Sequence, residues 1–163
     1  MTTQASHPVV ARTGDDTYFE DFVVGDVMRH ARGKTVTEMD GVLLCNLAMN
    51  TASGHFDEQL MADSAAGQRI VFGGISAALV VGLATQDTAE NAVGELGIDH
   101  ISFAVPVVHG DTLSAYTEVV AVEPGDEGSG TVTFRHWGVN QRDEVVLELQ
   151  RRVLIRRRPG GRR

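Results

Sequence analysis

The sequence predicts a single α+β domain in which a long buried central helix is wrapped by a curved antiparallel β-sheet. Three observations support this fold class. With 163 residues, the chain has the size of one domain that can bury a core of its own. Helical patterns come first and consecutive strand patterns follow, an order typical of antiparallel sheets. Between them, residues 75–84 are apolar on every side, as in a helix buried in a core.

The chain before this apolar run is expected to form a strand and two helices. A strand is predicted over Val27–Arg32, after a turn. Thr37 resembles a helix N-cap, because Asp40 follows three residues later in a variant of the capping box. After a polar break, Asp57 is placed to cap a short helix that continues through Met61.

The second half of the chain is expected to form four strands, because its runs are rich in Val, Thr, Phe and Tyr. The clearest alternation sets Leu113, Ala115 and Thr117 on one face of a strand. Turns rich in Gly and Asp separate the runs. The predicted strands are His100–Val107, Thr112–Val122, Thr131–Val139 and Glu144–Arg157.

Domain boundaries follow from composition. Residues 1–16 are polar and aperiodic, so they are expected to be loosely ordered. Residues 17–158 form the predicted domain, and residues 159–163 are a basic, solvated C-terminal end. No apolar run reaches the roughly 18 residues of a membrane span, and the first residues lack a signal-peptide pattern. The single cysteine suits a reducing compartment, so a cytoplasmic protein without a membrane partner is expected.

The charge distribution argues against a nucleic-acid partner. The net charge is −8, yet residues 151–163 contain seven arginines and no acidic residue, so the preceding 150 residues carry −15. An acidic body binds phosphate backbones poorly. For the basic end, the simplest interpretation is the end of a strand followed by solvated residues. A basic rim that contacts a phosphate-bearing ligand is the alternative.

Several common catalytic signatures are absent from the sequence. It contains no phosphate-binding loop, no dinucleotide-binding glycine motif, no H-E-x-x-H and no G-x-S-x-G. Its six histidines show no metal-ligand spacing, so neither a metal nor another cofactor is expected. Cys45 lies on the apolar face of a predicted helix, where an inert buried thiol is the expected state.

Two features can carry chemistry. His55 lies in a loop between two predicted helices, preceded by Asn50 and followed by Asp57, and a loop histidine among polar groups can act as an acid or base. It can equally be an ordinary surface histidine. The pair Gly73-Gly74 opens the apolar helix, whose first free amides can hold an oxygen that gains negative charge. A glycine turn that allows close packing is the structural alternative.

At these residues the sequence resembles the MaoC-like (R)-specific enoyl-CoA hydratases. In that family a helix ends in Asp, Asn-Pro follows, and the catalytic His lies five residues after the Asp and two before another Asp. The matching stretch here is Asn50 to Asp57. The family's Ile-Val-His-Gly corresponds to Ile70-Val71-Phe72-Gly73, and its strand-turn-strand signature to Pro106 to Leu113. The resemblance covers roughly residues 18–157.

The resemblance implies a hot-dog fold, a homodimer and an acyl-CoA partner. It implies a hydratase or dehydratase that adds or removes water across the α,β double bond of the thioester. Residues 18–22 and 72–75 look most like the branch related to mesaconyl-CoA hydratases, which implies a short, branched, dicarboxylic acyl group. Carried over, the catalytic residues are His55 and Asn50, and the substrate-binding residues are Gly73, Gly74 and Asp57.

The departures from the family pattern leave three outcomes open. Asn50 stands where the family has its catalytic aspartate, and Phe72 replaces a histidine. An amide can position water but cannot accept its proton. His55 can act alone as base and then acid, another carboxylate such as Asp57, Glu38 or Asp40 can assist, or catalysis is lost and only binding remains.

Two rival functions share the fold and the ligand. A hot-dog thioesterase is disfavoured, because residues 75–78 at the start of the apolar helix contain no acid and the first one is Asp87. A non-catalytic acyl-CoA-binding or assembly subunit is supported mainly by Asn50.

Overall fold

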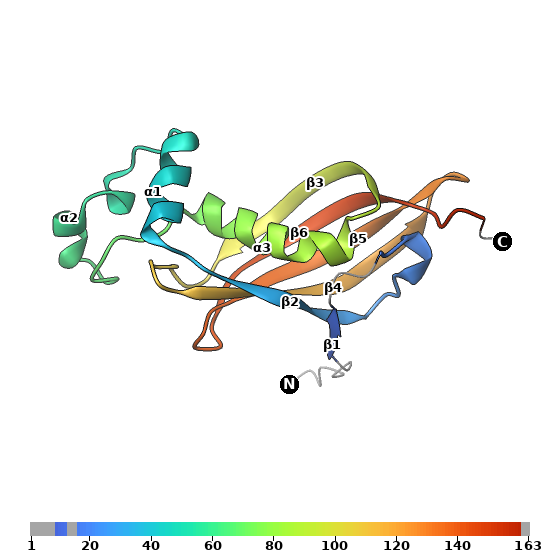
Figure 1. The fold of residues 1–163 in the computed structure, drawn as a ribbon, viewed down its shortest axis with the longest axis horizontal. Coiled ribbons are helices and arrows are strands. Elements are labelled where there is room, and N and C mark those ends of the chain that lie inside the picture. Colours follow the sequence, from blue (N-terminus) through green and yellow to red (C-terminus); the bar gives the residue numbers. More distant parts are fainter. Residues whose placement is uncertain (1–8, 13–15, 161–163) are drawn as a thin grey trace.

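The computed structural model describes residues 9–12 and 16–160, and in these ranges one curved sheet carries a long helix along one face (Figure 1). The strand order is β1-β2-β4-β5-β6-β3, and every pairing is antiparallel except β1 with β2. The strands are β1 (Val9–Arg12), β2 (Val27–Thr35), β3 (Ala92–Phe103), β4 (Thr112–Pro124), β5 (Ser129–Val139) and β6 (Val145–Arg156). The helices are α1 (Glu38–Leu47), α2 (Glu58–Ala62) and α3 (Gly73–Thr88), with short 3-10 turns η1 (Phe19–Asp21) and η2 (Ser53–His55).

Both predicted helix caps are present. The Thr37 side chain accepts a hydrogen bond from the Asp40 amide, and the Asp40 carboxylate accepts one from the Thr37 amide at 2.8 Å. Hydrogen bonds from Thr37 and from Lys34 lower the pKa of Asp40 to about 2. At α2, the Asp57 carboxylate accepts from the Leu60 amide at 2.9 Å. These local bonds set where each helix begins, independently of the rest of the fold.

The first of the four strands predicted in the second half of the chain was misplaced. Sequence patterning put a strand at His100–Val107, whereas β3 spans Ala92–Phe103 and residues 104–107 lie outside it. Gly94 and Gly97 weaken the strand pattern, yet pairing with β6 holds this segment in the sheet. The other three predicted strands correspond to β4, β5 and β6 within two residues at each end.

The core lies between α3 and the concave face of the sheet. The buried side of α3 includes Ile75, Val80 and Ala84, and the first two pack with Leu113, Leu147 and other apolar residues of the sheet. The expectation of a helix buried on every side is only partly met. Ala78 and Gly82 are exposed, and Leu79, Val81 and Leu83 are half-buried.

A buried polar chain crosses the core near the C-terminal end of α3. The His30 ring contacts Asp87 Oδ2 at 2.5 Å through Nδ1 and Thr117 Oγ1 at 2.6 Å through Nε2. Thr117 Oγ1 also lies 2.7 Å from His136 Nδ1. Burial lowers the pKa of His136 to about 3, so this ring is neutral at physiological pH. These contacts connect β2, α3, β4 and β5 through buried side-chain hydrogen bonds.

The two ends of the domain meet at the right of Figure 1. Arg157 lies over the Phe19 ring and pairs with Glu20, and Arg158 pairs with Asp21. Residues 1–8, 13–15 and 161–163 lie outside the described ranges. They make up most of the segment expected to be loosely ordered, residues 1–16, and most of the basic end, residues 159–163. Within residues 1–16, Val9–Arg12 form β1, which the sequence patterns did not predict.

In the described ranges, no helix combines the length and the apolar character needed to cross a membrane.

Candidate functional site

A cavity of about 520 Å³ lies at the N-terminal end of α3. One wall is the start of α3 together with His55, and the opposite wall is the segment that connects β3 to β4. The lining consists of His55, Ile70, Val71, Phe72, Gly73, Gly74, Ser76, Phe103, Ala104, Val105, Pro106, Val107 and Val146. Three of the five site residues predicted from the sequence, His55, Gly73 and Gly74, therefore lie on one cavity.

His55 is held in place by the backbone of Ile70. The Ile70 amide donates to the Gly54 carbonyl at 3.2 Å, which joins the η2 turn to this segment. The His55 ring nitrogen Nδ1 lies 2.8 Å from the Ile70 carbonyl oxygen. Since a carbonyl oxygen only accepts, Nδ1 carries the proton and the neutral ring has its free lone pair on Nε2. The ring is thereby oriented as a base.

The segment that holds His55 is itself braced by the loop before β4. The Val71 amide donates to the Val107 carbonyl at 2.8 Å. Asp111, which is 1% exposed, accepts from the Val108 amide and from the side chains of Gln141 and Arg142. Those bonds lower the pKa of Asp111 although its burial opposes the shift. The strand-turn-strand signature found in the sequence thus supports the cavity wall.

Gly73 and Gly74 begin α3 beneath two aromatic rings. A Cβ atom on Gly73 would lie 2.9 Å from the Phe103 ring, and one on Gly74 would lie 2.7 Å from the Phe72 ring. The Phe72 carbonyl accepts from the amides of Ile75 and Ser76. The amides of Gly73 and Gly74 precede the first helical hydrogen bond and have no backbone acceptor among the described residues. They remain available to an oxygen in the cavity.

The structure places Asn50 and Asp57 outside the lining of this cavity. The Asn50 carboxamide oxygen accepts from the Ala52 amide at 3.0 Å, so the side chain stabilises the turn after α1. Asp57 is exposed and caps α2. Asn50 thus stabilises the backbone before His55, and Asp57 stabilises the helix that follows it.

Sequence patterns missed Ser76 and the segment from Phe103 to Val107. Ser76 is 2% exposed and lines the cavity, and its hydroxyl has no hydrogen-bond partner among the described residues. A polar residue in the apolar run of residues 75–84 was the available signal. Cys45 lies behind Phe72, and burial raises the pKa of its thiol, as expected for an inert cysteine.

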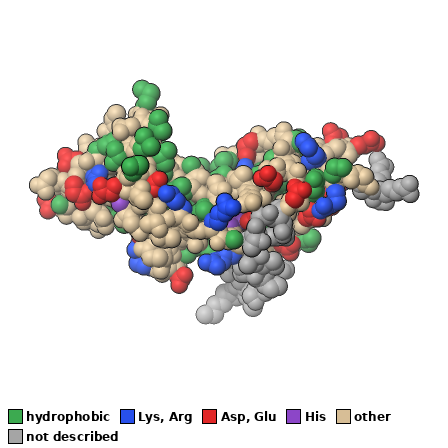
Figure 2. Space-filling model, viewed as in Figure 1, with side chains coloured by type: hydrophobic (Ala, Val, Ile, Leu, Met, Phe, Trp, Pro, Cys, Tyr) green, Lys and Arg blue, Asp and Glu red, His purple; other side chains and the backbone are tan. Residues whose placement is uncertain are grey.

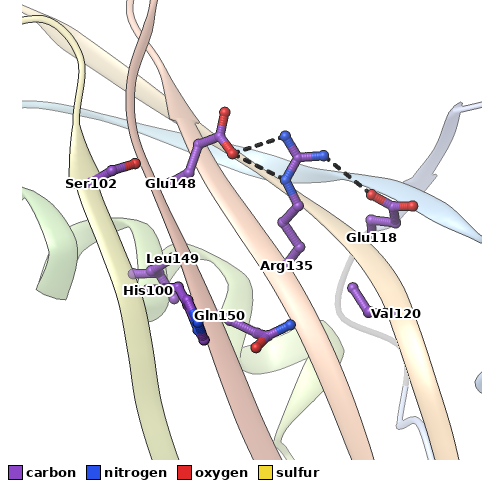
Figure 3. A pocket seen from close by; sticks show the side chains of 8 residues that line it. All are labelled: His100, Ser102, Glu118, Val120, Arg135, Glu148, Leu149 and Gln150. Carbon is purple, nitrogen blue, oxygen red and sulfur yellow. Dashed lines mark hydrogen bonds and ion pairs between the residues drawn. The ribbon is translucent and has the colours of Figure 1, made fainter. Parts of the chain in front are cut away.

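A second hollow of about 500 Å³ lies on the outer face of the sheet (Figure 3). Arg135 lies at its edge, and its guanidinium pairs with Glu148 at 2.8 Å and with Glu118 at 3.4 Å. Its positive charge is thus already matched by two carboxylates. His100 also lines this hollow, where its Nδ1 lies 2.6 Å from Asp99 Oδ1, but the hollow does not include the start of α3.

Among the described residues, no three His, Cys, Asp or Glu side chains are grouped so that they could hold a metal ion. The described residues do not support the alternative of a basic rim that contacts a phosphate-bearing ligand beside this cavity. Arg157 and Arg158 pair with acidic residues at the end of the sheet opposite the start of α3 (Figure 1).

Comparison with known proteins places these residues in a family context. The sequence model of the mesaconyl-CoA hydratase family matches residues 8–157. The β-methylmalyl-CoA dehydratase of Chloroflexus aurantiacus is 35% identical over 154 residues, which cover 91% of this chain and 42% of that protein. The chain therefore spans less than half the length of this relative.

Solved structures show the same fold. A putative MaoC domain protein dehydratase from Chloroflexus aurantiacus has a TM-score of 0.82 at 27% identity and covers 89% of this chain and 46% of that one. A Mycobacterium tuberculosis protein with a double hotdog fold has a TM-score of 0.81 at 22% identity, and its match covers 90% of this chain and 46% of that one. The predicted hot-dog architecture is confirmed.

Proposed function

Because the chain belongs to the mesaconyl-CoA hydratase family, we propose that it adds water to, or removes it from, the α,β double bond of an acyl-CoA thioester. The observation that carries the proposal is the shared cavity of His55 and the Gly73-Gly74 amides. It combines a base of defined tautomer with free N–H donors at the positive end of a helix. These are the two functions required for hydration of an enoyl thioester through an enolate intermediate.

In the proposed hydration, the thioester carbonyl oxygen accepts hydrogen bonds from the Gly73 and Gly74 amides. His55 Nε2 takes a proton from water while the water oxygen bonds to the β-carbon. The π electrons of the double bond move toward the carbonyl, and the amides stabilise the resulting enolate oxygen. The imidazolium then returns a proton to the α-carbon, which completes the addition of one water. The reverse sequence removes water.

For the substrate, we propose a short enoyl-CoA such as mesaconyl-CoA. This proposal rests on the match to the family model. A cavity of about 520 Å³ accommodates a small branched acyl group and the thioester. Its lining is apolar apart from His55, Ser76 and the glycine backbone. The free carboxylate of a dicarboxylic acyl group therefore extends toward solvent or toward groups outside this lining.

We also propose that two copies of the chain form a homodimer, which would supply the second half that the longer relatives contain. Within the described ranges, β3 pairs with β6 alone and leaves its other edge open. Its exposed side chains include Ile98, Ile101 and Phe103. Figure 2 also shows hydrophobic side chains gathered over α1, where Met39, Leu43 and Leu47 are exposed. In the view of Figure 1, α1 and β3 both lie along the upper side of the molecule.

The dimer can be tested by light scattering at micromolar concentration. We expect twice the 17.5 kDa chain mass, and we expect high salt to leave the dimer intact because the proposed contact is apolar and pairs sheet edges. Ile101→Lys should shift the species toward the monomer, whereas Val120→Lys, on another strand, should not. A wild-type monomer of 17.5 kDa would contradict the proposal.

The activity is tested by incubating the protein with mesaconyl-CoA and crotonyl-CoA. Loss of the enoyl absorbance without release of free thiol is the expected result. Release of free thiol instead would identify a thioesterase. Binding of either thioester without turnover would favour an acyl-CoA-binding subunit, the alternative to which the position of Asn50 points.

A cytoplasmic location is part of the same proposal. Its support is that Cys45 is buried and unpaired, since free thiols persist in reducing compartments.

A further inference from the structure

We propose that Ser76 holds the water molecule that His55 activates, an inference that rests on the proposed hydratase function. In dehydration, the same hydroxyl would hold the β-hydroxyl group of the substrate. Ser76 Oγ then supplies the second hydrogen bond that fixes the reacting oxygen.

The first supporting observation is the unused hydroxyl of Ser76. Its side chain is 2% exposed and has no hydrogen-bond partner among the described residues. The threonines of the same helix behave differently. Thr85 donates to the Val81 carbonyl at 2.7 Å and Thr88 to the Ala84 carbonyl at 2.8 Å, four residues earlier in each case. Ser76 could reach the Phe72 carbonyl in the same way, but its hydroxyl is not used in this bond.

The second observation is the place of Ser76 in the cavity. It lies three residues after Gly73 on α3, so the two residues share one helix face. Side chains on a helix lean toward its N-terminus, which directs the Ser76 hydroxyl toward the end that carries the free glycine amides. Among the described residues that line the cavity, Ser76 and His55 are the two whose side chains carry a hydrogen-bonding group.

The third observation is that Asn50 is occupied elsewhere. Its carboxamide oxygen accepts from the Ala52 amide, and the residue does not line the cavity. A water molecule that loses a proton to His55 needs a second partner to hold its oxygen in line with the β-carbon. Ser76 is the side chain on the cavity wall that can provide this contact.

The chemistry of the hydroxyl also decides which oxygen it binds. A neutral hydroxyl in an apolar lining matches a neutral oxygen, such as water or an alcohol. A buried carboxylate would need a cation or several donors, and no Lys or Arg lines this cavity. Ser76 therefore contacts the reacting oxygen and not the distal carboxylate of a dicarboxylic acyl group.

The test compares Ser76→Ala, Ser76→Thr and the control Thr88→Val with wild type, on both mesaconyl-CoA and crotonyl-CoA. Ser76→Ala should lower kcat by about tenfold on both substrates with KM nearly unchanged. Its melting temperature should equal or exceed that of wild type, because alanine removes a buried hydroxyl that has no partner. Ser76→Thr should recover part of the activity. Thr88→Val removes a bonded hydroxyl, so it should melt earlier and keep its turnover.

Several results would overturn the role of Ser76. Wild-type turnover in Ser76→Ala would show that the hydroxyl is not used. A loss confined to mesaconyl-CoA would mean that Ser76 contacts the distal carboxylate. An equal loss in Thr88→Val would mean that any hydroxyl of α3 has the same effect. Absence of wild-type turnover on both substrates would overturn the proposed function and this inference together. An active wild type with a fully active Ser76→Ala variant would overturn the inference alone.

Discussion

Replacing His55 with alanine is expected to lower kcat for enoyl-CoA hydration by about 10²–10⁴-fold, with a much smaller effect on KM. The reason is the ring's orientation. The Ile70 carbonyl holds Nδ1 at 2.8 Å, so Nε2 is the base, and the described cavity lining contains no carboxylate that could replace it. Steady-state loss of enoyl absorbance at several substrate concentrations separates the two kinetic parameters.

Two matched variants sharpen the His55 test. His55→Asn keeps an N–H donor near the position of Nδ1 and so preserves the contact with Ile70, but it offers no base. It should be as inactive as His55→Ala. His100→Asn alters a histidine at the hollow of Figure 3, at a φ of 50° that asparagine tolerates, and should retain full activity. Turnover retained by His55→Ala would end the proposed mechanism.

Gly73→Pro is expected to lower turnover by about 10²-fold or more, because it removes one of the N–H donors that face the thioester oxygen. The backbone is suited to the change. Gly73 is the first residue of α3, where proline is well tolerated, and Phe72 has φ −58° and ψ 126°, as residues before proline do. The kinetic assay is paired with circular dichroism to confirm that the helix forms.

The control for this variant is Gly73→Ala. Alanine keeps the N–H but places a Cβ 2.9 Å from the Phe103 ring, a clash that proline shares. The difference between the two variants therefore measures the lost donor, and the alanine effect measures the displaced ring. If both variants lose the same activity, the amide has no special role and the glycine serves only close packing.

The comparison of sequence and structure is clearest at the helices. Thr37 with Asp40, and Asp57 with the amide three residues later, form bonds within one turn of chain. Such local signals are readable without knowledge of the fold. The strand β3 shows the opposite case. Its glycines and its irregular pairing with β6 hid it, because the hydrogen bonds that hold it come from a strand about fifty residues later in the chain.

At the candidate site, the sequence alone predicted His55 and the glycine pair, because their order and spacing resemble a known family, and the structure places all three on one cavity. It also assigned roles to Asn50 and Asp57, whose side chains the structure places on the Ala52 amide and the α2 N-terminus. Sequence spacing reports which residues are neighbours along the chain, whereas the direction of each side chain depends on the turn that carries it.

The sequence by itself thus determined the fold class and the starts of α1 and α2, since these follow from patterns and caps within short segments. It also predicted His55 as a site residue. Only the tertiary structure decided the rest. The Ile70 carbonyl sets the His55 tautomer, the Phe103 and Phe72 rings cover the two glycines, and the Ser76 hydroxyl has no partner in the part of the chain that the structure describes. Each of these depends on contacts between segments distant in the chain, and such contacts form only when α3 packs against the folded sheet.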